Sequence, residues 1–310
     1  MTATGPQAPI GPAPASAEGA SAVGPPAVDV PKEGRGGIVG FLRSERLGAA
    51  AAAVILLIAL AAIFAPAVAP HDPLTQDRRA FMDGPSSTYL FGTDDLGRDI
   101  FSRLLHGARI SLYVGGMTVL LSLVLGTTLG LVSGYFGGFV DTVIQRFVDA
   151  VLAVPGLILA LFIAALLGPS TRNVILALTV LETPRFARIA RGETVQIRRQ
   201  EYVEAAKVLG ARPRWILLRH GVPNMAAPLV VVASLVFGQA IVAEAGLSFL
   251  GIGTPPPNPS WGLMLSQASR YLESAPWMVI FPGATLSVAV LAFNIFGDAL
   301  RDYFDPKLIR

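Results

Sequence analysis

Long uncharged runs of apolar residues dominate the chain from residue 47 onward. The runs 47–69 and 110–140 contain no charged side chain, and about 20 apolar residues are enough to span a bilayer as a helix. Later stretches predict further helices at 139–167, 172–189, 221–243 and 274–297. The pattern therefore predicts an all-α integral membrane protein with about six transmembrane helices.

Polar and proline-rich segments set the predicted boundaries. Residues 1–37 are rich in Pro, Ala and Gly, so they cannot bury enough apolar surface to offset the entropy of ordering. They predict a disordered cytoplasmic tail, with a secretory signal as the alternative. The remaining predicted parts are a first transmembrane helix in 38–69, an outer segment at 70–109, a core of about five transmembrane helices at 110–298, and a cytoplasmic C-terminus at 299–310.

The uncharged segment 245–269 is predicted not to form a transmembrane helix. It contains four prolines and four glycines, and lipid offers no partner for the backbone groups that proline leaves unpaired. We expect an outer loop or a re-entrant segment packed on protein. Trp261, within it, and Trp277, after it, are expected at the membrane interface as part of an aromatic belt.

Three glycines in the second apolar run recur every four residues. Gly126, Gly130 and Gly134 therefore share one face of the predicted helix. Small residues on one face allow another helix to approach closely in a membrane. We expect a tightly packed neighbour on this side, without assigning the glycines any chemistry.

The start of the third predicted helix carries polar side chains at four-residue spacing. Asp141, Gln145 and Asp149 lie on one face, which must contact protein or water and not lipid. Arg146 precedes Asp149 by three residues and is close enough to pair with it. Pro155 is expected to kink this helix.

Charge adds orientation but little chemistry. Only 15% of the residues are charged and the net charge is +3, which is too mild for a nucleic-acid footprint. Lys and Arg are densest between residues 185 and 219, where the helix 172–189 is expected to run directly into the cytoplasm. By the positive-inside rule, both termini are then cytoplasmic.

The segment 190–224 is a stretch of about 30 soluble, mostly helix-forming residues between two predicted membrane helices. A short helix is predicted at 201–209, Gly210 supplies its stop, and Pro213 begins another turn. Ala205 and Ala206 would let a second protein approach closely, and Glu204 offers a charged contact. Such a helix, tied to membrane helices on both sides, is suited to passing a mechanical push from a partner into the membrane.

Five residues of this segment resemble the EAA loop of ABC importer permeases: Glu204, Ala205, Ala206, Gly210 and Pro223. The resemblance implies a type I ABC importer permease fold, in which this loop forms a coupling helix that docks on a cytoplasmic ATPase. The sequence departs from the family at Gly221, where a bulky apolar residue is usual.

Two further segments resemble the second permease of dipeptide, oligopeptide and nickel importers. One is the outer-segment motif, made of Gly92, Thr93, Asp94, Gly97, Arg98 and Asp99. The other is the stretch 244–253 with 259–262, and residues 297–302 and 305–306 resemble the C-terminus of that subunit. The resemblance runs from about residue 40 to the end of the chain.

The resemblance also implies partners and a location. They are a homologous second permease subunit, one or two cytoplasmic ATPase subunits, an extracytoplasmic substrate-binding protein and the lipid bilayer, with no nucleic acid. The chain would be a multi-pass protein of the bacterial plasma (inner) membrane. ATP and Mg²⁺ would be bound by the ATPases, because this chain has no Gly-Lys-Ser/Thr phosphate loop.

Several single residues have plain structural interpretations. Glu244 could line the pathway but is expected to be a wetted helix terminus. Arg98 and Asp99 are expected to form structural pairs in an outer cap. His71, His106 and His220 are predicted to lie on different sides of the membrane, so we predict no metal site.

Two other functions stay open at this point. A gradient-driven secondary transporter would show internal repeats and charged residues near the midplane, and no clear repeat is present. A membrane hydrolase would need a nucleophile and a base at one depth, but the chain has no cysteine and no histidine within a predicted helix. We therefore expect no catalytic residue and no bound cofactor, and the pattern does not identify substrate-binding residues.

Overall fold

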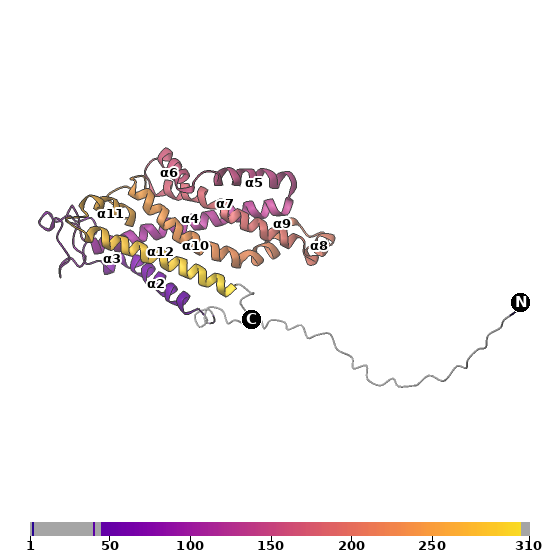
Figure 1. Cartoon of the computed structure of the whole chain (residues 1–310), viewed down its shortest axis with the longest axis horizontal. Coiled ribbons are helices and arrows are strands. Elements are labelled where there is room, and N and C mark those ends of the chain that lie inside the picture. The colour runs from indigo at the N-terminus through magenta and orange to yellow at the C-terminus, as the bar shows by residue number, and fades with distance from the viewer. Residues whose placement is uncertain (1, 3–39, 41–44, 305–310) are drawn as a thin grey trace, which may run out of the picture.

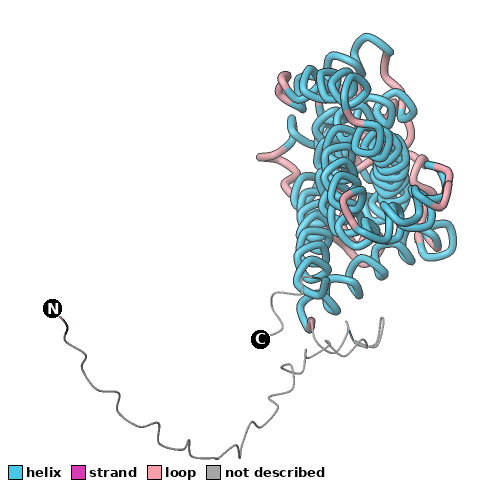
Figure 2. Tube along the Cα trace, turned by 90° about the vertical axis from the view of Figure 1, so that its right-hand side faces the viewer, coloured by secondary structure: helices cyan, strands magenta, loops and turns pink. Residues whose placement is uncertain are grey.

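Two long helices, α4 (Ile100–Phe136) and α7 (Thr171–Arg198), pack along each other and form the centre of a helical bundle. The computed structural model describes residues 2, 40 and 45–304, and these form helices joined by turns and loops (Figure 2). The helices α10 (Val222–Phe249) and α12 (Trp277–Phe304) pack on each other, and α2 (Arg46–Ile63) packs on α12 and α4 (Figure 1).

Four helical segments in the described part of the chain are long and apolar enough to cross a membrane. They are α2, α4, α12 and the continuous stretch Leu217–Phe249, which contains α10. A fifth crossing is available if α5 (Gly138–Leu152) and α6 (Gly156–Leu167) count as one broken span. The all-α membrane architecture is therefore confirmed.

The fourth predicted span, 172–189, lies within α7 but is not among these apolar segments. Its helix carries Glu182, Arg185 and Arg188. It packs on α4, α6 and α10, and 12 of its 28 residues are buried. A helix in this position can carry charge that a lipid-facing helix cannot.

The glycine face of α4 contacts α7, as predicted. A β-carbon on Gly126 would lie 2.6 Å from the carbonyl oxygen of Thr183, and one on Gly130 would lie 2.5 Å from that of Ala187. A β-carbon on Gly134 would lie 2.7 Å from the β-carbon of Thr194. Only glycine permits the two backbones to approach so closely along this line.

The third predicted helix is broken at Pro155, which separates α5 from α6 with a bend of 91°. The predicted kink is thus confirmed and is sharper than a bend within one helix. The expected pairing of Arg146 with Asp149 is wrong, because Asp149 pairs with Arg188 of α7 at 2.8 Å. The polar face of α5 points toward the arginines of its neighbour, and that interhelical contact decides the partner.

The segment 245–269 is not a single transmembrane helix, in line with the prediction. Its first residues complete α10, and a proline-containing loop leads to the short helix α11 (Trp261–Ala268), which packs on α10 and α12. The expected interface position of Trp261 is wrong. Its side chain is fully buried, and its indole nitrogen donates to the backbone oxygen of Leu104 at 3.2 Å.

Helix ends differ from the predicted ranges for local reasons. The helix α4 begins ten residues before the predicted start at 110, because Asp99 caps it by accepting from the amide of Ser102. The first predicted span forms α2, followed by the short turn α3 (Ala65–Val68). The predicted tail at 1–37 lies outside the described residues except for Thr2, as does the C-terminus beyond Phe304.

Candidate functional site

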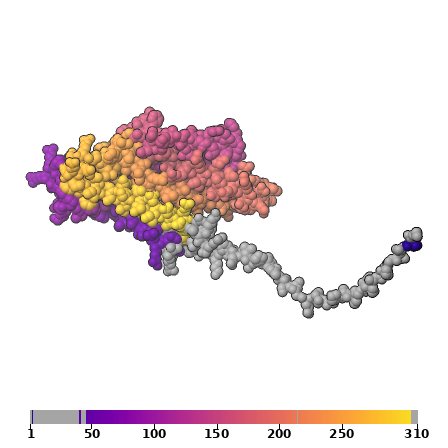
Figure 3. All heavy atoms as spheres, viewed as in Figure 1, coloured from indigo at the N-terminus to yellow at the C-terminus, as the bar shows by residue number. Residues whose placement is uncertain are grey.

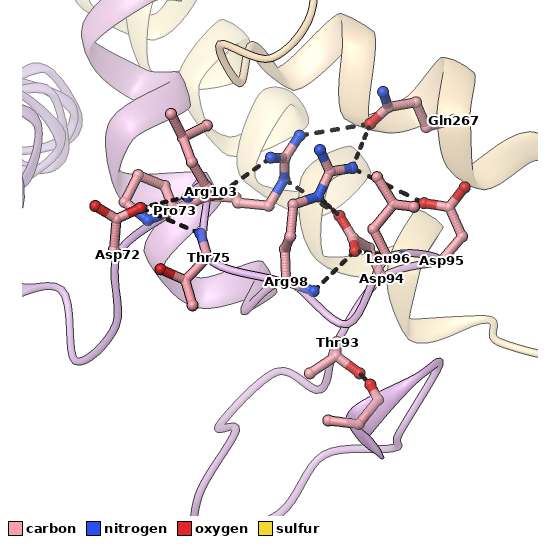
Figure 4. A network of polar contacts seen from close by, with 12 residues as sticks. Asp72, Pro73, Thr75, Thr93, Asp94, Asp95, Leu96, Arg98, Arg103 and Gln267 are labelled. Atoms are coloured by element: carbon pink, nitrogen blue, oxygen red, sulfur yellow. Dashed lines mark hydrogen bonds and ion pairs between the residues drawn. The ribbon is translucent and has the colours of Figure 1, made fainter. Parts of the chain in front are cut away.

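Asp94 and Arg98 of the outer-segment motif form a buried ion-pair network with Arg103 (Figure 4). Asp94 accepts from Nε of Arg98 at 2.7 Å and lies 3.4 Å from Nε of Arg103. The side-chain oxygen of Gln267, in α11, accepts from both guanidinium groups at 3.4 Å. The network therefore joins the outer segment, the first turn of α4 and α11.

The other motif residues shape the turn that holds this network. Gly92 and Gly97 have φ angles of +76° and +71°, which favour glycine. Gly92 packs under the ring of Trp277, whose indole nitrogen donates to the oxygen of Thr93 at 3.2 Å. The expectation of a structural outer cap at Arg98 and Asp99 agrees with this geometry.

Asp95 is only weakly paired within the outer cap, the turn formed by residues 92–99. Burial raises the pKa of its carboxyl, the nearby Asp94 raises it further, and Arg98 opposes the shift. The closest atom of Arg98 lies 3.9 Å away, because that guanidinium is held mainly by Asp94. The cap therefore contains one satisfied carboxylate beside one whose charge is disfavoured.

Glu244 is not the wetted helix terminus that the sequence suggests. Its side chain is fully buried and accepts hydrogen bonds from Ser111 of α4 at 3.1 Å and from Ser248 at 2.7 Å. Because a buried carboxyl without partners would be costly, this contact fixes the C-terminal half of α10 against α4. No periodic signal marks it, since Ser111 is 133 positions away.

The segment resembling an EAA loop folds as predicted. The helix α8 (Glu201–Val208) ends one residue before the predicted 209, and Gly210 follows with a φ of +80°. Pro213 begins α9 (Pro213–Ile216), which continues through a π-helical turn into α10. Pro223 lies at the start of α10, directly after this π-helical turn.

This segment lies at one end of the long axis, whereas α11 lies near the other (Figure 1). The surface view shows it as the salmon-coloured end of the molecule (Figure 3). The apolar side chains of Val208 and Leu209 are each 87% exposed there, and Trp215 is half exposed. Glu204 and Ala205 are exposed, and Ala206 is half-buried.

The remaining side of α8 is anchored to the bundle. Val203 is fully buried, and Nζ of Lys207 lies 5.7 Å from the ring centre of Tyr135 in α4. A polar hollow of about 410 Å³ separates α8 from the end of α7. It is lined by Gly134, Val195, Arg198, Arg199, Glu204 and Lys207. The helix thus presents one face outward while the other contacts the ends of α4 and α7.

Gly221, the departure from the family pattern, also has a local reason. It is buried, and a β-carbon there would lie 3.3 Å from Leu131 of α4. A larger side chain at this position would require the Leu131 side chain to shift. The sequence alone does not reveal this contact, because Gly221 and Leu131 are far apart along the chain.

No group of three potential metal-ligating side chains is present among the residues that the structure describes. The ring of His71 lies 3.6 Å from Asp99 in the outer cap. The ring of His220 packs beside Tyr202 and Trp215 at the opposite end.

Comparison with known proteins gives consistent relationships. Residues 126–310 match the family of binding-protein-dependent transport system inner membrane components. Residues 41–85 match the N-terminal transmembrane domain of oligopeptide transport permease C.

Two curated relatives have similar lengths. The dipeptide transport system permease protein of Alkalihalophilus pseudofirmus is 43% identical over 86% of this chain and 88% of that protein. The glutathione transport system permease protein of Pectobacterium atrosepticum is 44% identical over 86% and 89%. Among solved structures, a chain of the inward-facing methionine ABC transporter MetNI matches with a TM-score of 0.54 and 18% identity. That match covers 66% of this chain and 98% of the other, and it shows the shared fold.

Proposed function

The chain belongs to the family of binding-protein-dependent transport system inner membrane components, and on this premise we propose that it forms half of a peptide uptake pathway. It is a multi-pass permease subunit of an ABC importer, a class that works with ATPase and binding-protein partners. This membership favours the permease over the gradient-driven carrier and the membrane hydrolase.

The proposed cargo is a small peptide. Relatives at 40–44% identity are named for dipeptide, D,D-dipeptide and glutathione transport. All three names denote short peptides or peptide-like molecules. We propose that the second half of the pathway is a homologous permease and that the external binding protein sets most of the selectivity.

The proposed coupling element is α8. The observation that carries this assignment is the exposed apolar tip at Val208 and Leu209, next to Glu204 and Ala205. Exposed apolar side chains grouped with a charge are typical of a protein-binding surface. Because α8 is anchored beside the ends of α4 and α7, a push on it would move those helices.

In this proposal ATP and Mg²⁺ bind to one or two cytoplasmic ATPase subunits. Both termini and α8 lie on the cytoplasmic side, and α11 and the outer cap lie outside. ATP binding would close the ATPases and turn the pathway outward to receive cargo from the binding protein. Hydrolysis would return it to the inward-facing state.

The test is affinity purification of the tagged chain from native membranes in mild detergent, followed by mass spectrometry and peptide uptake in proteoliposomes. We expect a second permease and ATPase subunits to be recovered. Glu204→Lys should abolish uptake while leaving membrane insertion intact. Recovery of the chain alone, or normal uptake by the variant, would contradict the coupling role.

A further inference from the structure

Two arginines lie on an open side of the central helix α7. The side chains of Arg185 and Arg188 are 43% and 54% exposed, whereas Pro184, Phe186 and Ala187 between and beside them are buried. Gly192 and Gln196 are also exposed. Since these four positions recur every three or four residues, they share one face of the helix. The face forms a polar stripe from the middle of α7 to its cytoplasmic end.

Arg185, the first residue of this stripe, lies about halfway along α7. Arg185 is 14 residues from Thr171 and 13 from Arg198, which at 1.5 Å per residue places it about 20 Å from either end of α7. It donates to the side-chain oxygen of Gln239 in α10. Gln239 is ten residues from Phe249, or about 15 Å from the outer end of its own helix. In a hydrocarbon layer about 30 Å thick, Arg185 therefore lies near the middle.

An exposed guanidinium at this depth cannot face lipid, so it must face water or another protein. The sequence-based expectation placed these arginines among the cytoplasmic basic residues, whereas the contact with Gln239 places Arg185 beside the middle of α10. Arg188 is balanced by Asp149 at 2.8 Å. Arg185 has a weaker ionic partner, because the nearest oxygen of Glu182 is 3.6 Å away.

Both contacts of Arg185 use the same nitrogen, Nη1. No interaction with a described residue occupies Nε and Nη2, which leaves the edge of the guanidinium that suits bidentate binding of a carboxylate. The competing Glu182 would keep such binding weak, and a transport site must release what it binds.

We propose that the stripe Arg185–Arg188–Gly192–Gln196 lines the translocation pathway and that Arg185 binds the terminal carboxylate of the passing peptide. The inference rests on the proposed function, because it is the peptide that supplies the carboxylate. Below Arg185, the Arg188–Asp149 pair offers charges of both signs to a zwitterionic cargo. The stripe would then guide the peptide toward the cytoplasm.

The first experiment measures access of water to the stripe. The chain contains no cysteine, so single cysteines can be introduced at Arg185 and at Gly192 without removing another. Gly192 has open space around its β-carbon, so Gly192→Cys tests the stripe even if Arg185→Cys does not assemble. Leu291→Cys, on an exposed apolar position of α12, is the control.

The whole importer in proteoliposomes is treated with a charged, membrane-impermeant methanethiosulfonate, and the mass of this chain is measured. We expect modification at positions 185 and 192 and none at 291. If both stripe positions resist the reagent as position 291 does, lipid or a partner subunit covers the stripe and the proposal is wrong.

The second experiment tests the carboxylate role in the same importer. We expect Arg185→Gln to reduce peptide uptake per ATP hydrolysed about tenfold, with ATP hydrolysis still stimulated by the binding protein. Arg185→Lys should restore part of the uptake, and Arg172→Gln, at the outer end of α7, should not change it. Unchanged uptake per ATP in Arg185→Gln would overturn the assignment of Arg185. An unaltered importer that takes up no peptide would instead refute the proposed function, and the labelling result would still decide whether the stripe faces water.

Discussion

Arg191 in α7 holds Asp141 in α5 through two parallel hydrogen bonds, each 2.6 Å long. Ser133 of α4 also donates to Asp141, and Gln145 donates to Ser133 at 3.1 Å. The adjoining ends of three helices, α4, α5 and α7, are thereby joined around one carboxylate. The polar side chains of α5, which are spaced four residues apart, contact α7 and α4.

Removing this carboxylate should loosen α5. We expect Asp141→Asn to lower the free energy of unfolding by about 1 kcal/mol, because a bidentate pair is strong but Arg191 is partly exposed. Arg188→Gln should cost less, since both members of its pair are half exposed. Thermal unfolding in detergent measures both, and equal effects would show that the bidentate geometry adds nothing.

The close approach of α4 and α7 should tolerate no side chain at its centre. Gly130→Ala places a β-carbon 2.5 Å from the carbonyl oxygen of Ala187, so we expect a loss of about 1–3 kcal/mol or failure to assemble. Gly116→Ala is the matched control, because its β-carbon would lie 3.7 Å from the nearest atom. Expression yield and melting temperature distinguish the two, and equal behaviour would contradict the packing argument.

The two neighbouring acids of the outer cap should respond in opposite directions. Asp94→Asn breaks a buried pair with two arginines, and we expect a loss of about 3–5 kcal/mol. Asp95→Asn should raise the melting temperature at pH 7. The measurement is thermal unfolding of each variant in detergent, and a destabilised Asp95→Asn at pH 7 would contradict it.

The effect of Asp95 should also depend on pH. Its pKa is raised in the folded protein, chiefly by burial, so the folded state holds this proton more tightly than the unfolded chain. The resulting stability is fully present below the ordinary pKa of about 3.9 and is lost as the pH rises through the raised value. The difference between Asp95→Asn and the unaltered chain should therefore shrink as the pH falls from 7 toward 4.

The apolar tip of α8 should matter for assembly and not for folding. We expect Val208→Ser combined with Leu209→Ser to leave the melting temperature unchanged, because both side chains are almost fully exposed. The same change should weaken binding of the ATPase about tenfold, the effect of losing roughly 1.4 kcal/mol of apolar contact. Pull-down of the ATPase at graded concentrations measures this. Phe162→Ser, which alters an exposed residue of α6, is the control.

Features that depend on neighbours along the chain could be predicted from the amino-acid sequence. Uncharged runs long enough to span a bilayer identified the apolar helices, Pro155 predicted the break between α5 and α6, and Gly210 predicted the end of α8. The four-residue spacing of Gly126, Gly130 and Gly134 even predicted a tight helix contact. Periodicity carries this information because each helix turn repeats regularly.

The contacts that each helix face makes could be seen only in the folded protein. Asp149 pairs across to Arg188 instead of along its own helix, Glu244 is buried against Ser111, and Trp261 fills the core. Arg185 contacts Gln239 in the middle of α10. A periodic pattern indicates which side chains share one face of a helix. The element packed against that face comes from a distant part of the sequence. The free energy of burying a charge or an indole depends on that element, so it could not be read from the chain alone.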